Sequence, residues 1–124
     1  MGVANTVINH PAEYRQIVDQ HRLVFVLFVS EYCAACQGAD KRFEHISSKY
    51  TGEVKSLILD TRQTPKIDEL GEELGTPTLV VYRDKTEAKR ILGIGFPEDQ
   101  EAYLDGIFSH FVKDTPFPDL PIYL

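Results

Sequence analysis

The amino-acid sequence predicts an α/β fold, in which a mixed sheet of four or five strands is flanked by helices on both faces. Segments 23–29 and 78–82 are almost wholly apolar, which suits strands that are covered on both faces. Segments 39–50 and 97–112 instead carry apolar residues at helical spacing. The segments follow one another in the order β-α-β-α-β-α-β-β-α, which is typical of an α/β sandwich.

Short apolar or β-branched runs predict the strands. In chain order they are 6–8, 23–29, 54–59, 78–82 and 89–94. The run from Leu23 to Val29 is apolar at every position, which favours a central strand. A polar turn, R-D-K-T at 83–86, separates the last two strands.

Apolar spacing and end signals predict the helices. They are 11–20, a long stretch that follows the cysteines, 65–74 and 97–112. Asn9 and Pro11 suit the cap and first turn of the first helix, and Pro97 suits the first turn of the last. Gly75 stands where the third helix would end.

The chain is long enough for one domain, which we expect over residues 1–113, followed by a proline-rich tail at 114–124. The tail reads D-T-P-F-P-D-L-P-I-Y-L, and its three prolines forbid a continuing helix. Its apolar residues suggest that it docks, either along its own domain or in a groove on a neighbouring protein.

Composition excludes several classes of function. The chain has 13 basic and 19 acidic residues, a net charge of −6, and no basic stripe, so nucleic acid is not an expected partner. No apolar run approaches the roughly 20 residues that span a bilayer. The first ten residues, M-G-V-A-N-T-V-I-N-H, lack the features of a signal peptide, so we expect a reducing, cytoplasmic location.

Both cysteines lie in one short stretch, S-E-Y-C-A-A-C-Q at 30–37. Placed in the first turn of the long helix, Cys33 and Cys36 would have Cβ atoms roughly 5–6 Å apart, close to disulfide geometry. Cys33 would face unpaired backbone N–H groups at the helix start, which favour the reactive thiolate. Cys36, one turn inside, would be more buried. The asymmetry predicts that Cys33 attacks and Cys36 resolves.

Other interpretations of the two cysteines remain open. Structural zinc needs four ligands, yet the chain has no second cysteine pair, and its four histidines show no paired spacing. The cysteines could also be small buried residues, or one could belong to a Cys–His hydrolase. A dithiol–disulfide couple, which needs no metal or organic cofactor, accounts best for the pair.

Four motifs together resemble the thioredoxin superfamily over about residues 5–113. They are V-F-V-L-F-V leading into E-Y-C-A-A-C, the strand V-K-S-L-I-L-D, the segment L-G-T-P-T-L-V-V-Y, and the glycine of I-L-G-I-G. C-x-x-C alone is a weak signal, whereas C-x-x-C followed some forty residues later by G-T-P-T is specific.

The resemblance implies a thioredoxin fold and further site residues. Pro77 would follow a cis peptide bond, and the backbone of Thr76 would pair with an extended substrate segment. Gly93 would let substrate approach the same groove, and Tyr32 would line it. Ala34 and Ala35 would take the place of the usual Gly-Pro pair and contact substrate.

The sequence departs from the thioredoxin pattern near the cysteines. Leu27 stands where many thioredoxins have a buried aspartate that is thought to relay a proton from the resolving cysteine. Ser56 and Gln37 stand where lysines are common. Because Leu27 removes that base, we expect slower resolution of mixed disulfides. Because Ala34-Ala35 replaces the usual Gly-Pro, we expect a reduction potential somewhat less reducing than that of thioredoxin.

The sequence predicts a thiol–disulfide oxidoreductase. Its partners would be disulfide-containing proteins and a reductase or small thiol that supplies electrons. Two alternatives use the same fold: a binding or adaptor module with little redox turnover, and a disulfide isomerase or oxidant that works outside the cytoplasm.

Overall fold

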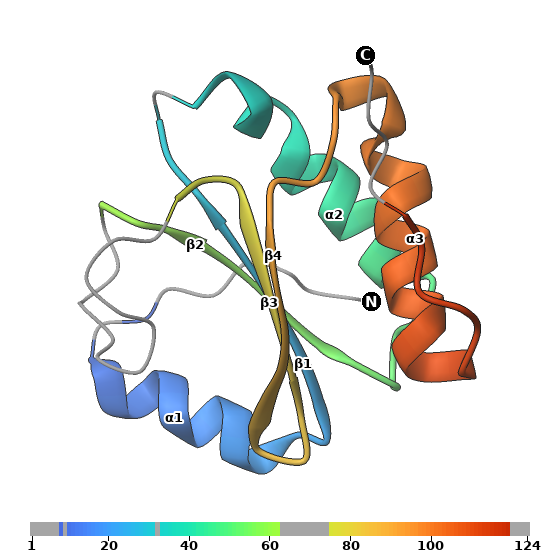
Figure 1. Ribbon diagram of the computed structural model, residues 1–124. Coiled ribbons are helices and arrows are strands. Elements are labelled where there is room, and N and C mark those ends of the chain that lie inside the picture. Colours follow the sequence, from blue (N-terminus) through green and yellow to red (C-terminus); the bar gives the residue numbers. More distant parts are fainter. Residues whose placement is uncertain (1–7, 9, 32, 63–74, 120–124) are drawn as a thin grey trace.

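The computed structural model describes residues 8, 10–31, 33–62 and 75–119 of the chain. Four strands form one mixed sheet in the order β2-β1-β3-β4 (Figure 1). Their bounds are Leu23–Val29 for β1, Lys55–Asp60 for β2, Thr78–Arg83 for β3 and Thr86–Leu92 for β4. β1 pairs in parallel with β2, while β3 is antiparallel to both β1 and β4. The predicted mixed sheet is therefore confirmed.

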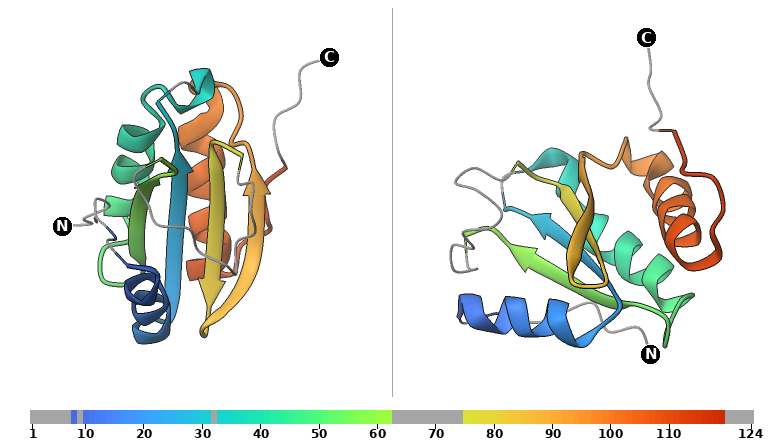
Figure 2. Two further views of the ribbon diagram at one scale, coloured as in Figure 1. Left: turned by 90° about the vertical axis from the view of Figure 1, so that its left-hand side faces the viewer. Right: turned by 60° about the horizontal axis from the view of Figure 1, so that its bottom comes forward.

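Helices cover both faces of this sheet (Figure 2). Helix α1 (Pro11–Gln20) lies on one face, and α2 (Ala39–Ser48) and α3 (Pro97–Lys113) lie together on the other. No helix in the described ranges is long and apolar enough to cross a membrane. The predicted α/β arrangement with helices on both faces is correct.

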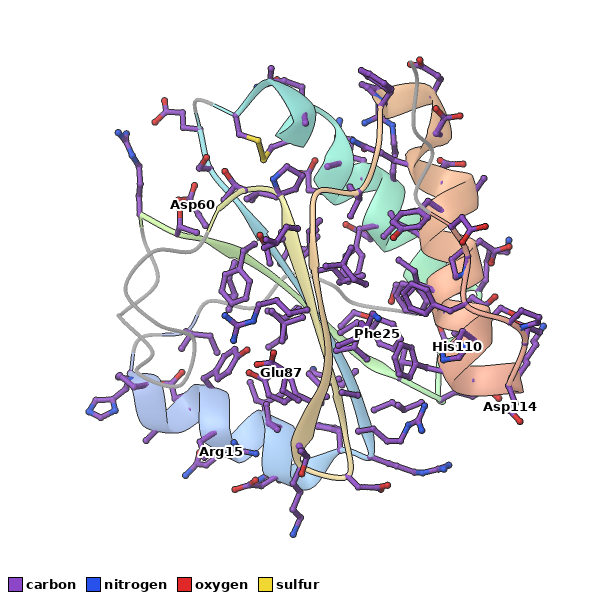
Figure 3. All side chains as sticks on the ribbon, in the orientation of Figure 1. Arg15, Phe25, Asp60, Glu87, His110 and Asp114 are labelled. Atoms are coloured by element: carbon purple, nitrogen blue, oxygen red, sulfur yellow. A yellow bond between two sulfur atoms is a disulfide. The ribbon has the colours of Figure 1, made fainter. Side chains whose placement is uncertain are left out.

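Strand β1 is apolar throughout because its side chains alternate between two cores. Val24, Val26 and Phe28 belong to the cluster on the α1 side, where the Tyr14 hydroxyl bonds that of Tyr82 at 2.8 Å. Leu23, Phe25 and Leu27 belong to the other cluster. There the ring of Phe25, labelled in Figure 3, stacks on that of Phe108 with centroids 4.0 Å apart.

The start of β4 and the cap of α1 differ from the prediction. Strand β4 begins at Thr86, three residues before the predicted start, because Asp84 and Lys85 have positive φ and close a two-residue hairpin. The early part of β4 is exposed and charged, as edge strands often are, so it shows no apolar pattern. The cap of α1 is His10 rather than Asn9, and its Nδ1 accepts from the amide of Ala12.

Two predicted elements lie outside the described residues. The helix at 65–74 does so entirely, and the strand at 6–8 does so except for Ile8, which is buried in the cluster on the α1 side.

Residues 115–119 run back along α3 after Asp114 ends the helix in a left-handed conformation (Figure 1). The Nδ1 atom of His110 lies 2.6 Å from the carbonyl oxygen of Thr115. Phe117 packs against the core, and a Cβ on Gly106 would meet Pro118 at 2.9 Å. This part of the tail therefore docks on its own domain, and Gly106 is the helical position that makes room for it.

We expect Phe117→Ala to lower the free energy of unfolding by about 1–2 kcal/mol, because a half-buried ring leaves the core. Pro116→Ala, one residue earlier on an exposed site, is the matched control and should change stability by less than about 0.5 kcal/mol. Urea denaturation measures both. Equal stabilities of the two variants would contradict docking of the tail in solution.

Candidate active site

Three segments meet at one end of the sheet. The strand register places Phe28 opposite Thr78, and Thr78 opposite Leu92. The chain that leaves β1, the chain that enters β3 and the chain that leaves β4 therefore lie side by side, at the top of the sheet in Figure 1. Hydrogen bonds join them: the hydroxyls of Ser30 and Thr76 lie 2.8 Å apart, and the amide of Gly93 donates to the Pro77 carbonyl at 2.9 Å.

The cysteine pair lies at this end of the sheet as a disulfide (Figure 3). The Cα atoms of Cys33 and Cys36 are 5.1 Å apart. Cys36 is buried, at 7% exposure, whereas Cys33 is half-buried. Of the flanking residues, Ala34 is exposed and Ala35 half-buried.

The prediction that the cysteines open the long helix is wrong. They lie on a separate 3₁₀ turn, η1 (Ala34–Cys36), and α2 begins only at Ala39. Gly38 separates the two with a φ of 76°, a left-handed conformation that an α-helix cannot contain. Cys33 therefore caps a single short turn, and the argument from an α-helix dipole does not apply to it.

The other predicted site residues fall at the same end of the sheet. The Thr76–Pro77 peptide bond is cis. Gly93 has a φ of 83°, and a Cβ built there meets no atom within 4 Å, so its surroundings are open. Tyr32 lies outside the described residues.

Leu27 and Ser56 stand where thioredoxins often carry an aspartate and a lysine, and both side chains are uncharged here. Leu27 is fully buried in the cluster under α2 and α3. The Ser56 hydroxyl is hydrogen-bonded to that of Ser47 on α2, so it is satisfied within the core. Neither position supplies a proton acceptor for Cys36.

A cleft of about 400 Å³ opens beside Cys36, and sequence reasoning did not identify it. Three acidic residues, Glu31, Asp40 and Asp60, are among those that line it. Asp60 is reachable because β1 and β2 are parallel and end together, with Val29 opposite Asp60. Figure 3 shows Asp60 at the same end of the sheet as the disulfide. The cleft thus depends on the pairing of β1 with β2, which is a tertiary contact.

A buried amide also contacts the cysteine loop. The Gln100 side chain is fully buried, and its Nε2 donates to the carbonyl oxygens of Ala35 at 3.0 Å and Gly95 at 3.1 Å. Its Oε1 accepts from Arg42 Nη1 at 3.0 Å, and the same nitrogen donates to the Gln37 carbonyl at 2.9 Å. Sequence reasoning missed these residues too. The sequence did offer one signal for Gln100: it lies at helical spacing from the apolar residues of α3.

Within the described ranges, no three histidine, cysteine, aspartate or glutamate side chains cluster as metal ligands would. A vicinal dithiol that closes into a disulfide can exchange two electrons with another disulfide without further groups.

Comparison with known proteins places this site in a family. The thioredoxin family model matches residues 5–104. Thioredoxin 1 of Plasmodium falciparum is 28% identical over 87 residues, which cover 70% of this chain and 83% of that protein. Thioredoxin H-type of Chlamydomonas reinhardtii is 28% identical over 75 residues, or 60% of this chain and 66% of that one.

Solved structures share the fold. Oxidised thioredoxin from Plasmodium falciparum superposes with a TM-score of 0.71 at 22% identity, covering 89% of this chain and 98% of that one. Thioredoxin from Trypanosoma brucei brucei gives 0.70 at 19% identity, covering 90% and 92%. Because the family match spans most of the sequence and includes the cysteine pair, this chain belongs to the thioredoxin family of thiol–disulfide oxidoreductases.

Proposed function

We propose that the protein reduces disulfides of other proteins, with Cys33 as the attacking thiol and Cys36 as the resolving thiol. The observation that carries this assignment is the difference in exposure: Cys33 is half-buried and Cys36 is buried. A protein disulfide is too bulky to reach a buried sulfur, so it meets Cys33 first.

The exchange balances without a cofactor. The Cys33 thiolate attacks one substrate sulfur, forms a mixed disulfide and releases the other substrate sulfur as a thiolate. Cys36, as its thiolate, then attacks the Cys33 sulfur. This step closes the Cys33–Cys36 disulfide and releases the second substrate thiol. Two electrons have passed to the substrate, and a reductase or small thiol must return them to the pair.

Substrate would lie across the loop that carries Thr76 and Pro77. Pro77 has no N–H, so an extended substrate chain would pair with the backbone of Thr76 in the manner of an added strand. The open space beside Gly93 and the exposure of Ala34 support a substrate path over this surface. Ala35 would border the path, and Tyr32 enters the proposal through the family resemblance alone.

The cellular setting is proposed from the same chemistry. A dithiol that reduces other proteins must itself be kept reduced, which is the normal condition of the cytoplasm. We therefore propose a cytoplasmic location, with disulfide-containing proteins as substrates.

Cys36→Ser should trap substrate as a mixed disulfide, because the resolving thiol is missing while Cys33 still attacks. Incubation with a disulfide-bonded protein such as insulin, followed by non-reducing electrophoresis and mass spectrometry, detects the adduct. Cys33→Ser is the matched control and should form at least tenfold less of the mixed-disulfide adduct. Equal adduct on both variants would overturn the assigned roles. A wild-type protein that neither reduces insulin nor equilibrates with glutathione would indicate an adaptor instead.

The resolving step should be slow and limited by thiolate supply, because the apolar Leu27 stands at the core position from which a carboxylate could take the proton of Cys36. Rapid-mixing kinetics should show its rate rising with pH, because only the thiolate attacks. The attack step, measured in Cys36→Ser, provides the internal comparison. A resolving rate that is independent of pH would contradict this account.

A further inference from the structure

We propose that Gln100 and Arg42 are positioning residues for the redox pair: they hold the backbone of the C-A-A-C loop in the shape that the disulfide needs, and thereby make the dithiol a stronger reductant. The proposal rests on the dithiol exchange of the preceding subsection. We call the two side chains and their hydrogen bonds to Ala35, Gln37 and Gly95 the loop clamp.

The loop needs such a clamp because it is not part of a helix. In a continuous helix the carbonyl oxygens of Ala35 and Gln37 would accept from backbone amides four residues ahead. Gly38 interrupts that ladder with its left-handed conformation. Gln100 and Arg42 donate to these carbonyls instead, at 3.0 and 2.9 Å.

The loop clamp holds the Ala35–Cys36 peptide, which leads into Cys36. The carbonyl of the Ala35–Cys36 peptide accepts from Gln100, and its N–H donates to the Cys33 carbonyl at 3.1 Å. Because both ends of this peptide are hydrogen-bonded, it cannot rotate without breaking a bond. The same amide of Gln100 donates to Gly95, so the loop is also tied to the segment that enters α3.

The position of Gln100 argues against a purely structural role. It continues the buried stripe of α3 formed by Tyr103, Leu104 and Ile107, where an apolar side chain would pack without any hydrogen bond. A buried amide is unfavourable unless its donors and acceptor are satisfied. Its two donated bonds reach Ala35 in the loop and Gly95, and its accepted bond comes from Arg42, which also donates to Gln37.

Arg42 reaches the loop because Gly38 leaves it room. A Cβ at Gly38 would lie 3.1 Å from both terminal guanidinium nitrogens of Arg42. The glycine therefore serves two purposes: it ends the cysteine turn, and it admits the side chain that replaces the helical donors.

The effect on redox chemistry follows from effective concentration. In the disulfide, the sulfur bond itself holds the two cysteines together. In the dithiol only the loop backbone does so, and the clamp limits how far Cys36 can move from Cys33. Loss of the clamp therefore loosens the dithiol more than the disulfide, which lowers the effective concentration of one thiol at the other. Oxidation of the dithiol then becomes less favourable.

Gln100→Met tests this directly, since methionine is similar in size and cannot donate. We expect the equilibrium constant for oxidation of the dithiol by glutathione disulfide to fall five- to tenfold. A tenfold fall corresponds to a reduction potential about 30 mV higher. The rate of the resolving step should fall by a similar factor, whereas attack by Cys33, measured in a Cys36→Ser background, should not change.

Ser56→Ala is the matched control. It removes a buried hydrogen bond to Ser47 on α2, outside the redox loop, so it should lower stability without shifting the redox equilibrium. Arg42→Lys, at a half-buried site, provides a milder second variant and should shift the constant in the same direction as Gln100→Met. If Gln100→Met does not fold, the redox equilibrium of Arg42→Lys tests the proposal in its place.

The outcomes separate the two proposals. A wild-type protein that does not equilibrate with glutathione contradicts the oxidoreductase role itself. A wild-type protein that equilibrates, with Gln100→Met or Arg42→Lys giving the same constant, overturns the clamp alone. A constant that falls in Ser56→Ala as far as in the clamp variants would also overturn it, because the shift would then follow stability.

Discussion

The burial of β1 on both faces is the constraint on which the rest of the structure depends. Its seven residues supply side chains alternately to the cluster under α1 and to the cluster under α2 and α3. It also pairs with β2 on one side and with β3 on the other. The cysteine loop leaves the end of this strand, so the redox pair is anchored to the most buried element of the described chain.

The cysteine loop follows a different physical rule from the core. It leaves regular structure at Val29 and regains an α-helix only at Ala39, so its backbone polar groups need partners outside a ladder. Some of these partners are local, in the hydrogen bonds of the 3₁₀ turn η1. The rest comes from Gln100 and Arg42, which belong to two different helices. The interface between α2 and α3 thus contains the polar side chains that support the site.

The sequence predicts those elements whose signal is spread over many residues. The span Leu23–Val29 is predicted without error, because every position in it is apolar. The start of α3 at Pro97 is also correct, and its end differs by one residue. Such periodic patterns reflect burial, which is the largest contribution to the fold. Two predicted segments, at 6–7 and 65–74, lie outside the described residues.

The features that sequence reasoning missed depend on single residues or on tertiary contacts. The left-handed conformation of Gly38 separates η1 from α2, and a lone glycine inside a helical pattern does not reveal its φ angle. The partners of Gln100 come from loops far apart in sequence, so no local pattern could name them. Cys33 and Cys36 were predicted from their spacing, and Pro77 and Gly93 from the family resemblance, whereas no motif marks Asp60 beside the cleft.

The short span of the disulfide limits how much the bond contributes to the stability of the fold. The bond joins residues only three apart, so it closes a very small loop. In the chain-entropy account such a loop is worth about 2 kcal/mol, far less than a bridge across a whole domain. The two apolar clusters, rather than the bond, therefore hold the molecule folded. Opening and closing the disulfide should therefore change the free energy of unfolding by only about 2 kcal/mol.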